Sequence, residues 1–111
     1  MSVELCGLDE LDMDKGVKGM EVELDGTTVS LVLVRVDNEV YAYRNRCPHT
    51  GVELNWMPDQ FLDPDRAFIQ CATHDARFRI EDGECIFGPC VGDALQALPV
   101  SIRDEKIFLS P

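Results

Sequence analysis

Two short sequence fragments, each holding a cysteine and a histidine, constrain this chain more than any other feature. They are Cys47-Pro48-His49 and Cys71-Ala72-Thr73-His74, and together they contain both histidines of the chain and two of its five cysteines. Two thiolates and two imidazoles fit either a tetrahedral zinc ion or a two-iron, two-sulfide centre in which histidines hold one iron. The pattern therefore predicts a metal centre built from Cys47, His49, Cys71 and His74.

The spacing inside the first fragment favours the binuclear centre. In an extended segment, residues i and i+2 point to the same side, so Cys47 and His49 can face a common centre. Pro48 stiffens this segment because its ring fixes the backbone angle φ. One residue between two ligands is short for a structural zinc site, in which two or more residues usually separate neighbouring ligands. Zinc in a Cys₂His₂ site is the alternative.

The size and composition of the chain are those of one soluble domain. A length of 111 residues predicts a single domain over residues 1–111, and 45% hydrophobic with 28% charged residues is ordinary for such a protein. No apolar run approaches the roughly 20 residues of a membrane helix, and the first residues show no secretory signal. We therefore expect a cytoplasmic location, where cysteines stay reduced.

The charge of the chain is strongly negative, with 21 acidic and 10 basic residues and a net charge of −11. Such a chain repels phosphate backbones and anionic membrane surfaces, so we expect neither a nucleic-acid nor a membrane partner. The acidity fits either a solvated surface or an electrostatic field that steers a basic surface of a protein partner.

Short β-type segments separated by turn signals predict an all-β fold of the sandwich or barrel type. Apolar residues alternate with acidic ones from Met20 to Leu24, and the apolar run from Val29 to Val36 is long enough for a central strand. Residues 7–19 are expected to form a loop or a short turn. Further strands are expected at residues 40–43, 61–62, 67–70, 77–80, 84–87, 99–103 and 106–109. Each cysteine and histidine fragment follows a predicted strand and opens a loop.

The remaining cysteines have less informative surroundings. Cys85 and Cys90 could form a redox pair or a second site, but no further histidine exists to complete one, so we expect buried packing thiols. Cys6 is expected to be a free thiol in a mobile terminus. Trp56 and Met57 follow the first fragment, and we expect them to shield the centre or to form part of a docking face.

The two fragments and their neighbours resemble the signature of Rieske [2Fe–2S] domains. The similarity includes residues 44–51, 70–74, 82–84 and 88–89 and extends over most of the chain, from Met20 to Leu109. It implies a Rieske-like fold of small antiparallel sheets with a cluster-binding subdomain at one tip. It also implies that Cys47 and Cys71 hold one iron, while His49 and His74 hold the outer iron.

Departures from the high-potential members of the family are informative. Those members carry an extra cysteine in each ligand loop, joined as a disulfide, where this chain has Val52 and Thr73. They also carry a serine and a tyrosine after the second histidine, where this chain has Ala76 and Phe78. The chain thus resembles the soluble ferredoxin and oxygenase branch. No histidine is left for the mononuclear iron site that an oxygenase catalytic subunit needs.

The resemblance therefore implies an electron carrier and not an enzyme. We expect a soluble Rieske-type ferredoxin with a [2Fe–2S] cluster, which passes single electrons from a reductase to an oxygenase or another oxidoreductase. Two alternatives are a small cluster-bearing subunit of a larger oxidoreductase, and a structural or regulatory module that a cluster or a zinc ion only stiffens.

Overall fold

The computed structural model describes residues 3–24, 26–46, 48, 54, 61–65, 67–71, 76–88 and 91–110. Within these ranges nearly all regular structure is β, with one short 3₁₀ turn at Leu8–Glu10. The strands are β1 Val3–Gly7, β2 Asp14–Leu24, β3 Thr27–Val36, β4 Glu39–Arg44, β5 Phe68–Gln70, β6 Arg77–Arg79, β7 Cys85–Phe87, β8 Ala97–Leu98, β9 Val100–Arg103 and β10 Lys106–Leu109.

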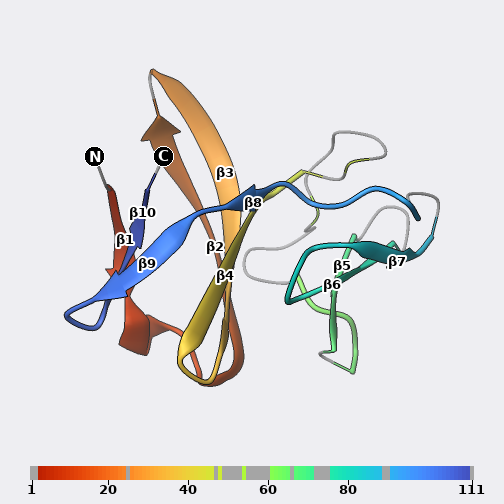
Figure 1. Ribbon diagram of the computed structural model, residues 1–111, viewed down its shortest axis with the longest axis horizontal. Helices are drawn as coiled ribbons and strands as arrows, with labels where there is room; N and C mark the ends of the chain where they lie inside the picture. The colour runs from red at the N-terminus through yellow and green to blue at the C-terminus, as the bar shows by residue number, and fades with distance from the viewer. Residues whose placement is uncertain are drawn as a thin grey trace.

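The strands form three antiparallel sheets with the orders β1-β10-β9, β2-β3-β4-β8 and β5-β6-β7. Figure 1 shows the first two sheets together at the end that carries both termini, and the small β5-β6-β7 sheet at the opposite end. The predicted all-β fold of small antiparallel sheets is therefore confirmed. In the part of the chain that the structure describes, no helix is long and apolar enough to cross a membrane.

Strand β3 lies between two hydrophobic cores. Its apolar run is buried on both faces, because successive side chains of a strand point in opposite directions. Leu31 and Leu33 pack into the core shared with the β1-β10-β9 sheet, whereas Val32 and Val34 pack into the core beneath the small sheet. The central strand predicted from Val29 to Val36 is thus confirmed, and it joins the two halves of the molecule.

The prediction of a loop or short turn over residues 7–19 holds for residues 8–13, which include the 3₁₀ turn at Leu8–Glu10, but it was wrong from Asp14 onward. Strand β1 ends at Gly7 and β2 already begins at Asp14, pairing with β3 from Asp14 opposite Val36. The glycine that suggested a loop, Gly16, lies next to a β-bulge, where an added Cβ would come within 2.1 Å of the Asp12 backbone nitrogen. A glycine inside a strand often marks such a close approach of two backbone segments.

Cys6 is a free thiol, as predicted, but the prediction that it lies in a mobile terminus was wrong. Cys6 lies in β1 with 7% of its surface exposed, and burial in the core raises the pKa of its thiol. Buried Arg35 fastens the segment that follows β1. Its guanidinium donates hydrogen bonds to the carbonyl oxygens of Leu8, Leu11 and Asp37 at 3.0, 3.1 and 2.7 Å.

The strands of the small sheet lie close to their predicted positions. The predicted segment 61–62 is reduced to one bridge between Leu62 and Ile69, and β8, which pairs with β4, was not predicted. A strand of two residues is too short for its alternation pattern to be recognised in sequence.

Candidate metal centre

Of the four predicted ligands, only Cys71 is among the described residues. It follows β5 directly and is fully buried. Cys47, His49 and His74 lie outside the described residues, as do Val52, Trp56, Met57, Thr73 and Cys90. Within the described part of the chain, no group of three or more potential ligand side chains comes together. The described residues that flank the two ligand fragments are therefore the part of the centre that the structure shows.

The first loop is anchored by Asn45, a buried residue directly after β4. Its backbone amide donates to the carbonyl of Ser30 in β3 at 2.9 Å, and its side-chain oxygen accepts a hydrogen bond from the backbone amide of Leu54 at 2.8 Å. This second bond closes the stretch of chain that contains Cys47 and His49. Leu54 is itself fully buried, so both ends of the loop are fixed.

The second loop is closed at its base by the backbone of Cys71. The Cys71 amide donates to the carbonyl of Ala76 at 2.8 Å, and the neighbouring residues Gln70 and Arg77 pair across β5 and β6. His74 lies in sequence inside this closed stretch. The pairing of β5 with β6 therefore fixes the two ends of the second loop, Cys71 and Ala76, relative to each other.

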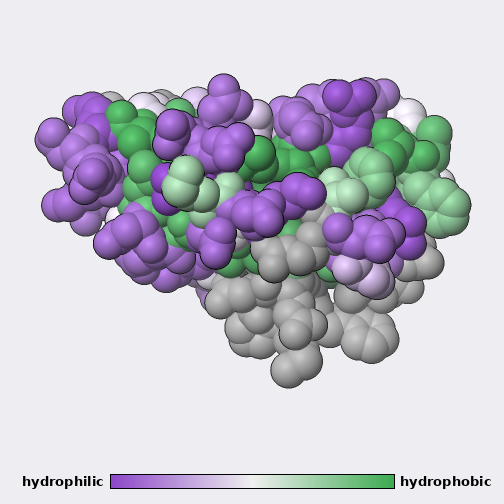
Figure 2. All heavy atoms as spheres, turned by 90° about the horizontal axis from the view of Figure 1, so that it is seen from below, coloured by the Kyte–Doolittle hydropathy of each residue, from purple (hydrophilic) through white to green (hydrophobic). Residues whose placement is uncertain are grey.

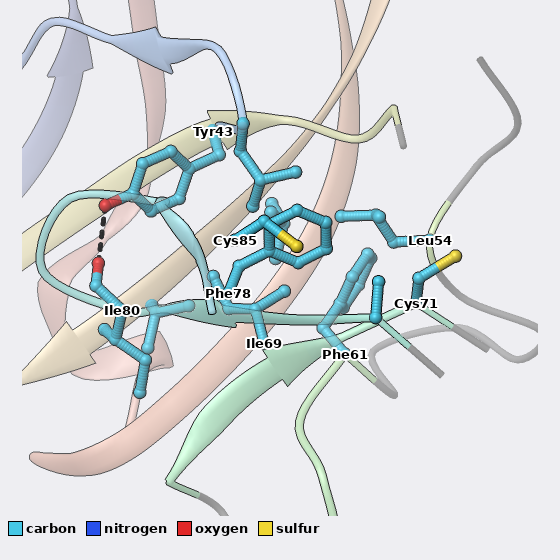
Figure 3. Packing of buried hydrophobic residues seen from close by; sticks show 12 residues of the cluster. Tyr43, Leu54, Phe61, Ile69, Cys71, Phe78, Ile80 and Cys85 are labelled. Atoms are coloured by element: carbon cyan, nitrogen blue, oxygen red, sulfur yellow. Dashed lines mark hydrogen bonds between the residues drawn. The ribbon is translucent and has the colours of Figure 1, made fainter. Parts of the chain in front are cut away.

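Both loop bases belong to a single hydrophobic core. Leu54 from the first loop and Cys71 and Ala76 from the second are buried in the same cluster, together with Phe61, Ile69 and Phe78 (Figure 3). Figure 3 shows the Cys71 sulfur pointing away from the rings of Phe61 and Phe78. The residues that flank the two ligand fragments are therefore held by one core, as a shared metal centre requires.

A third segment packs against the base of the second loop. Gly88 follows β7 with φ at +102°, and an added Cβ would lie 2.8 Å from the Ala76 Cα atom. No side chain fits between these two backbones. The sequence indicates this glycine only through the family resemblance, because the contact joins segments that are separate in sequence.

Cys85, in β7, is buried with 2% of its surface exposed, and its thiol donates a hydrogen bond to the Phe87 carbonyl at 3.3 Å. The prediction of a buried packing thiol is confirmed for Cys85. Around it, Ile86, Phe87 and Val91 are exposed apolar residues, and Figure 2 shows hydrophobic surface at the end of the molecule where β7 lies. This surface adjoins Gly88 and hence the second loop.

A family model described as the Rieske [2Fe-2S] domain matches residues 2–100 of the chain. The chain belongs to the Rieske family. Members of this family bind a [2Fe–2S] cluster, and the described residues of this Rieske protein fit one: a buried cysteine directly follows a strand, and residues that flank both ligand fragments are buried in one apolar core.

Similar proteins agree with this assignment. The ferredoxin subunit of 3-phenylpropionate/cinnamic acid dioxygenase from Photorhabdus laumondii is 27% identical over 96% of this chain and 90% of its own. The Escherichia coli K12 subunit of the same name is 29% identical over 83% of this chain and 81% of its own. Among solved structures, the ferredoxin of carbazole 1,9a-dioxygenase from Nocardioides aromaticivorans superposes with a TM-score of 0.75 at 25% identity, covering 100% of this chain and 98% of its own.

A further solved structure, a complex of reduced oxygenase and oxidised ferredoxin in carbazole 1,9a-dioxygenase, contains a chain with the same fold. It matches with a TM-score of 0.73 at 19% identity and covers 98% of this chain and 92% of its own.

Proposed function

We propose that this Rieske protein is a one-electron carrier and not itself a catalyst, formed by a single domain over residues 1–111. Cys47 and Cys71 hold one iron of its cluster, and His49 and His74 hold the outer iron. The observation that carries the proposal is that Leu54 and Cys71 are buried in one core, with hydrogen bonds that join Asn45 to Leu54 and Cys71 to Ala76.

When bound, a Rieske cluster accepts and releases one electron, at a higher potential than an all-cysteine cluster. The task of the protein is to keep the ligands in place in both redox states. The Asn45–Leu54 and Cys71–Ala76 hydrogen bonds fix the ends of the two ligand loops. The core that contains Leu54 and Cys71 keeps water away from the side of the centre that faces the protein interior.

The proposed electron acceptor is an oxygenase and the proposed donor is a reductase. Curated relatives are ferredoxin subunits of dioxygenases, and a structural neighbour is a ferredoxin in complex with an oxygenase. The exposed residues Ile86, Phe87 and Val91 beside the second loop supply an apolar docking surface, and the net charge of −11 favours a basic partner. The same charge disfavours nucleic acid and anionic membranes, and we place the protein in the cytoplasm.

Iron and labile-sulfide analysis of the isolated protein, with an electron paramagnetic resonance spectrum after reduction, tests the proposal. We expect about two irons and two sulfides per chain and a Rieske-type spectrum. Cys71→Ala should lose the cluster, whereas Cys85→Ala removes a buried thiol that is not a proposed ligand and should keep it. Stoichiometric zinc in protein made with a sufficient iron and sulfide supply would instead support the structural-module alternative.

The docking part of the proposal has its own test. Electron transfer from the reduced protein to an oxygenase should slow as salt rises, because screening acts over about 8 Å at physiological ionic strength. Rates that do not change with salt would assign docking to the apolar surface alone.

A further inference from the structure

A pocket lined by two arginines lies beside the first ligand loop. Its volume is about 280 Å³, and its described lining residues are Arg44, Arg46, Pro48, Ala94 and Gln96. Arg44 ends β4, and its backbone amide donates to the carbonyl of Gln96 at 2.9 Å, which joins the two walls. Pro48 is the residue between Cys47 and His49, so the pocket borders the first fragment itself.

The two arginines have no carboxylate partner among the residues that the structure describes. Over the described residues, neither the Arg44 nor the Arg46 guanidinium forms an ion pair or a side-chain hydrogen bond. Lys18, Arg79 and Lys106, by contrast, each lie within ion-pair distance of a carboxylate. In a chain with 21 acidic and 10 basic residues, the described lining of this pocket contains two cationic side chains and no carboxylate, an arrangement that favours an external anion.

The other walls indicate which kind of anion fits. Pro48 and Ala94 present apolar surface, and Gln96 offers an amide. A guanidinium matches the planar carboxylate through paired hydrogen bonds, while the apolar walls suit a hydrocarbon body. Phosphate would place charged oxygens against Pro48 and Ala94, where they gain no hydrogen bonds. The volume of about 280 Å³ is larger than a carboxylate group alone would occupy, and it lies near the lower end of the range for ligand pockets.

We infer that the pocket is a binding site for a small organic acid. The carboxylate lies against the Arg44 and Arg46 guanidiniums, and the apolar body lies against Pro48 and Ala94. Binding itself does not depend on the proposed electron-transfer role.

A second consequence rests on the proposed function. An anion in this pocket lies next to the segment of Cys47 and His49, and a nearby negative charge disfavours the addition of an electron. The oxidised protein should therefore bind the acid more tightly than the reduced protein, and by linkage the acid should lower the reduction potential.

Calorimetric titration of the cluster-loaded protein at low ionic strength tests the site, with benzoate as the probe and phosphate as the comparison. Benzoate should bind, and Arg44→Gln/Arg46→Gln should weaken its affinity at least about tenfold through the loss of charge-assisted hydrogen bonds. The control Arg103→Gln/Lys106→Gln removes the same charge from β9 and β10, in a different sheet, and should leave the affinity unchanged.

A second variant keeps both arginines. Ala94→Glu introduces a carboxylate at an exposed wall position, which should occupy the guanidiniums and also abolish benzoate binding. The inference would be overturned by a wild-type protein that takes up no benzoate, by equal weakening in both double variants, or by phosphate binding as tightly as benzoate.

The redox arm compares benzoate affinity in the oxidised and the dithionite-reduced protein. Affinity should fall about twofold or more on reduction, because the added electron repels the bound carboxylate. Equal affinities would overturn the coupling to the cluster. A protein without a redox-active cluster would overturn the proposed function but would leave the benzoate site intact.

Discussion

The hydroxyl of Tyr43 donates a hydrogen bond to the backbone carbonyl of Ile80 at 2.5 Å. Tyr43 belongs to β4 of the four-stranded sheet, whereas Ile80 begins the turn between β6 and β7 of the small sheet (Figure 3). Both residues are buried with 2% of their surfaces exposed. The bond therefore connects the half of the molecule that carries the termini to the half that carries the second ligand loop.

Tyr43→Phe should lower the free energy of unfolding by about 1–2 kcal/mol, because the buried Ile80 carbonyl loses its donor. Urea unfolding of the cluster-loaded protein measures the effect. Tyr41→Phe is the matched control, since its hydroxyl bonds to Glu39 at the exposed surface, and it should change stability by less than about 0.5 kcal/mol. An equal decrease in the free energy of unfolding in the two variants would show that the buried hydrogen bond contributes no more than the exposed one.

The same tyrosine should make the protein sensitive to alkali. Burial is the main cause that raises the pKa of Tyr43 above its ordinary value of about 10, and the nearby Asp82 carboxylate raises it further. From about pH 10 upward the unfolded chain loses this proton while the folded protein keeps it, so the free energy of unfolding falls. Stability measured between pH 8 and 11 should decline less steeply in Tyr43→Phe. Parallel curves for the two proteins would contradict the assignment to Tyr43.

Gly88→Ala should destabilise the protein and reduce its iron content, because the new methyl group would lie 2.8 Å from the Ala76 Cα atom at the base of the second loop. Gly92→Ala is the control, since Gly92 has a similar φ of +104° with nothing within 4 Å of an added Cβ. Both variants have the cost of a positive φ. Only Gly88→Ala has the additional overpacking cost, of about 1–3 kcal/mol. Equal unfolding midpoints would remove the argument for a tight contact.

Ala76→Ser/Phe78→Tyr should raise the reduction potential from the low end of the Rieske range, near about −150 mV. Both residues are fully buried at the base of the second loop, so the new hydroxyls lack water as a partner. Hydroxyls that donate to the cluster stabilise the reduced state by on the order of 1 kcal/mol each, which corresponds to tens of millivolts.

Protein-film voltammetry measures this shift, and Phe108→Tyr in β10, in another sheet, serves as the control. A wild-type potential above about +100 mV would contradict the premise that the missing hydroxyls keep the potential low.

Arg35→Lys should lower the free energy of unfolding by about 2–3 kcal/mol, since one ammonium group cannot reach the three carbonyls of Leu8, Leu11 and Asp37 together. Amide hydrogen exchange should accelerate first at residues 8–11. The control, Arg103→Lys, keeps a cation near the Phe108 ring at the surface and should have little effect. Uniform acceleration over the whole chain would show that Arg35 does not act locally.

Much of the fold could be predicted from alternation and turn residues, because β3 and the hairpins carry strong local patterns. The first part of β2, over residues 14–19, could not be predicted in this way. Its charged residues and glycines resemble a loop, and only the long pairing with β3 and the bulge beside Gly16 make it a strand. Burial of Cys6 likewise depends on pairing between β1 and β10, at opposite ends of the sequence.

The candidate ligands could be predicted from residue chemistry and spacing, because few side chains bind metals. The residues that support them could not. Asn45 holds the first loop through Leu54, nine positions later, and Gly88 contacts Ala76 across two strands. Neither contact leaves a periodic trace in the sequence. They arise from the packing of segments whose mutual position is set by the whole fold.

The antiparallel pairing of β1 with β10 places Val3 opposite Leu109, so the chain enters and leaves the fold at neighbouring points. Figure 1 shows these points at the end away from the β5-β6-β7 sheet. An anchor to a solid surface could therefore be attached at either terminus with nearly the same result. In both cases the protein would be attached to an electrode at the end that carries the termini, and the β5-β6-β7 end would face the solution.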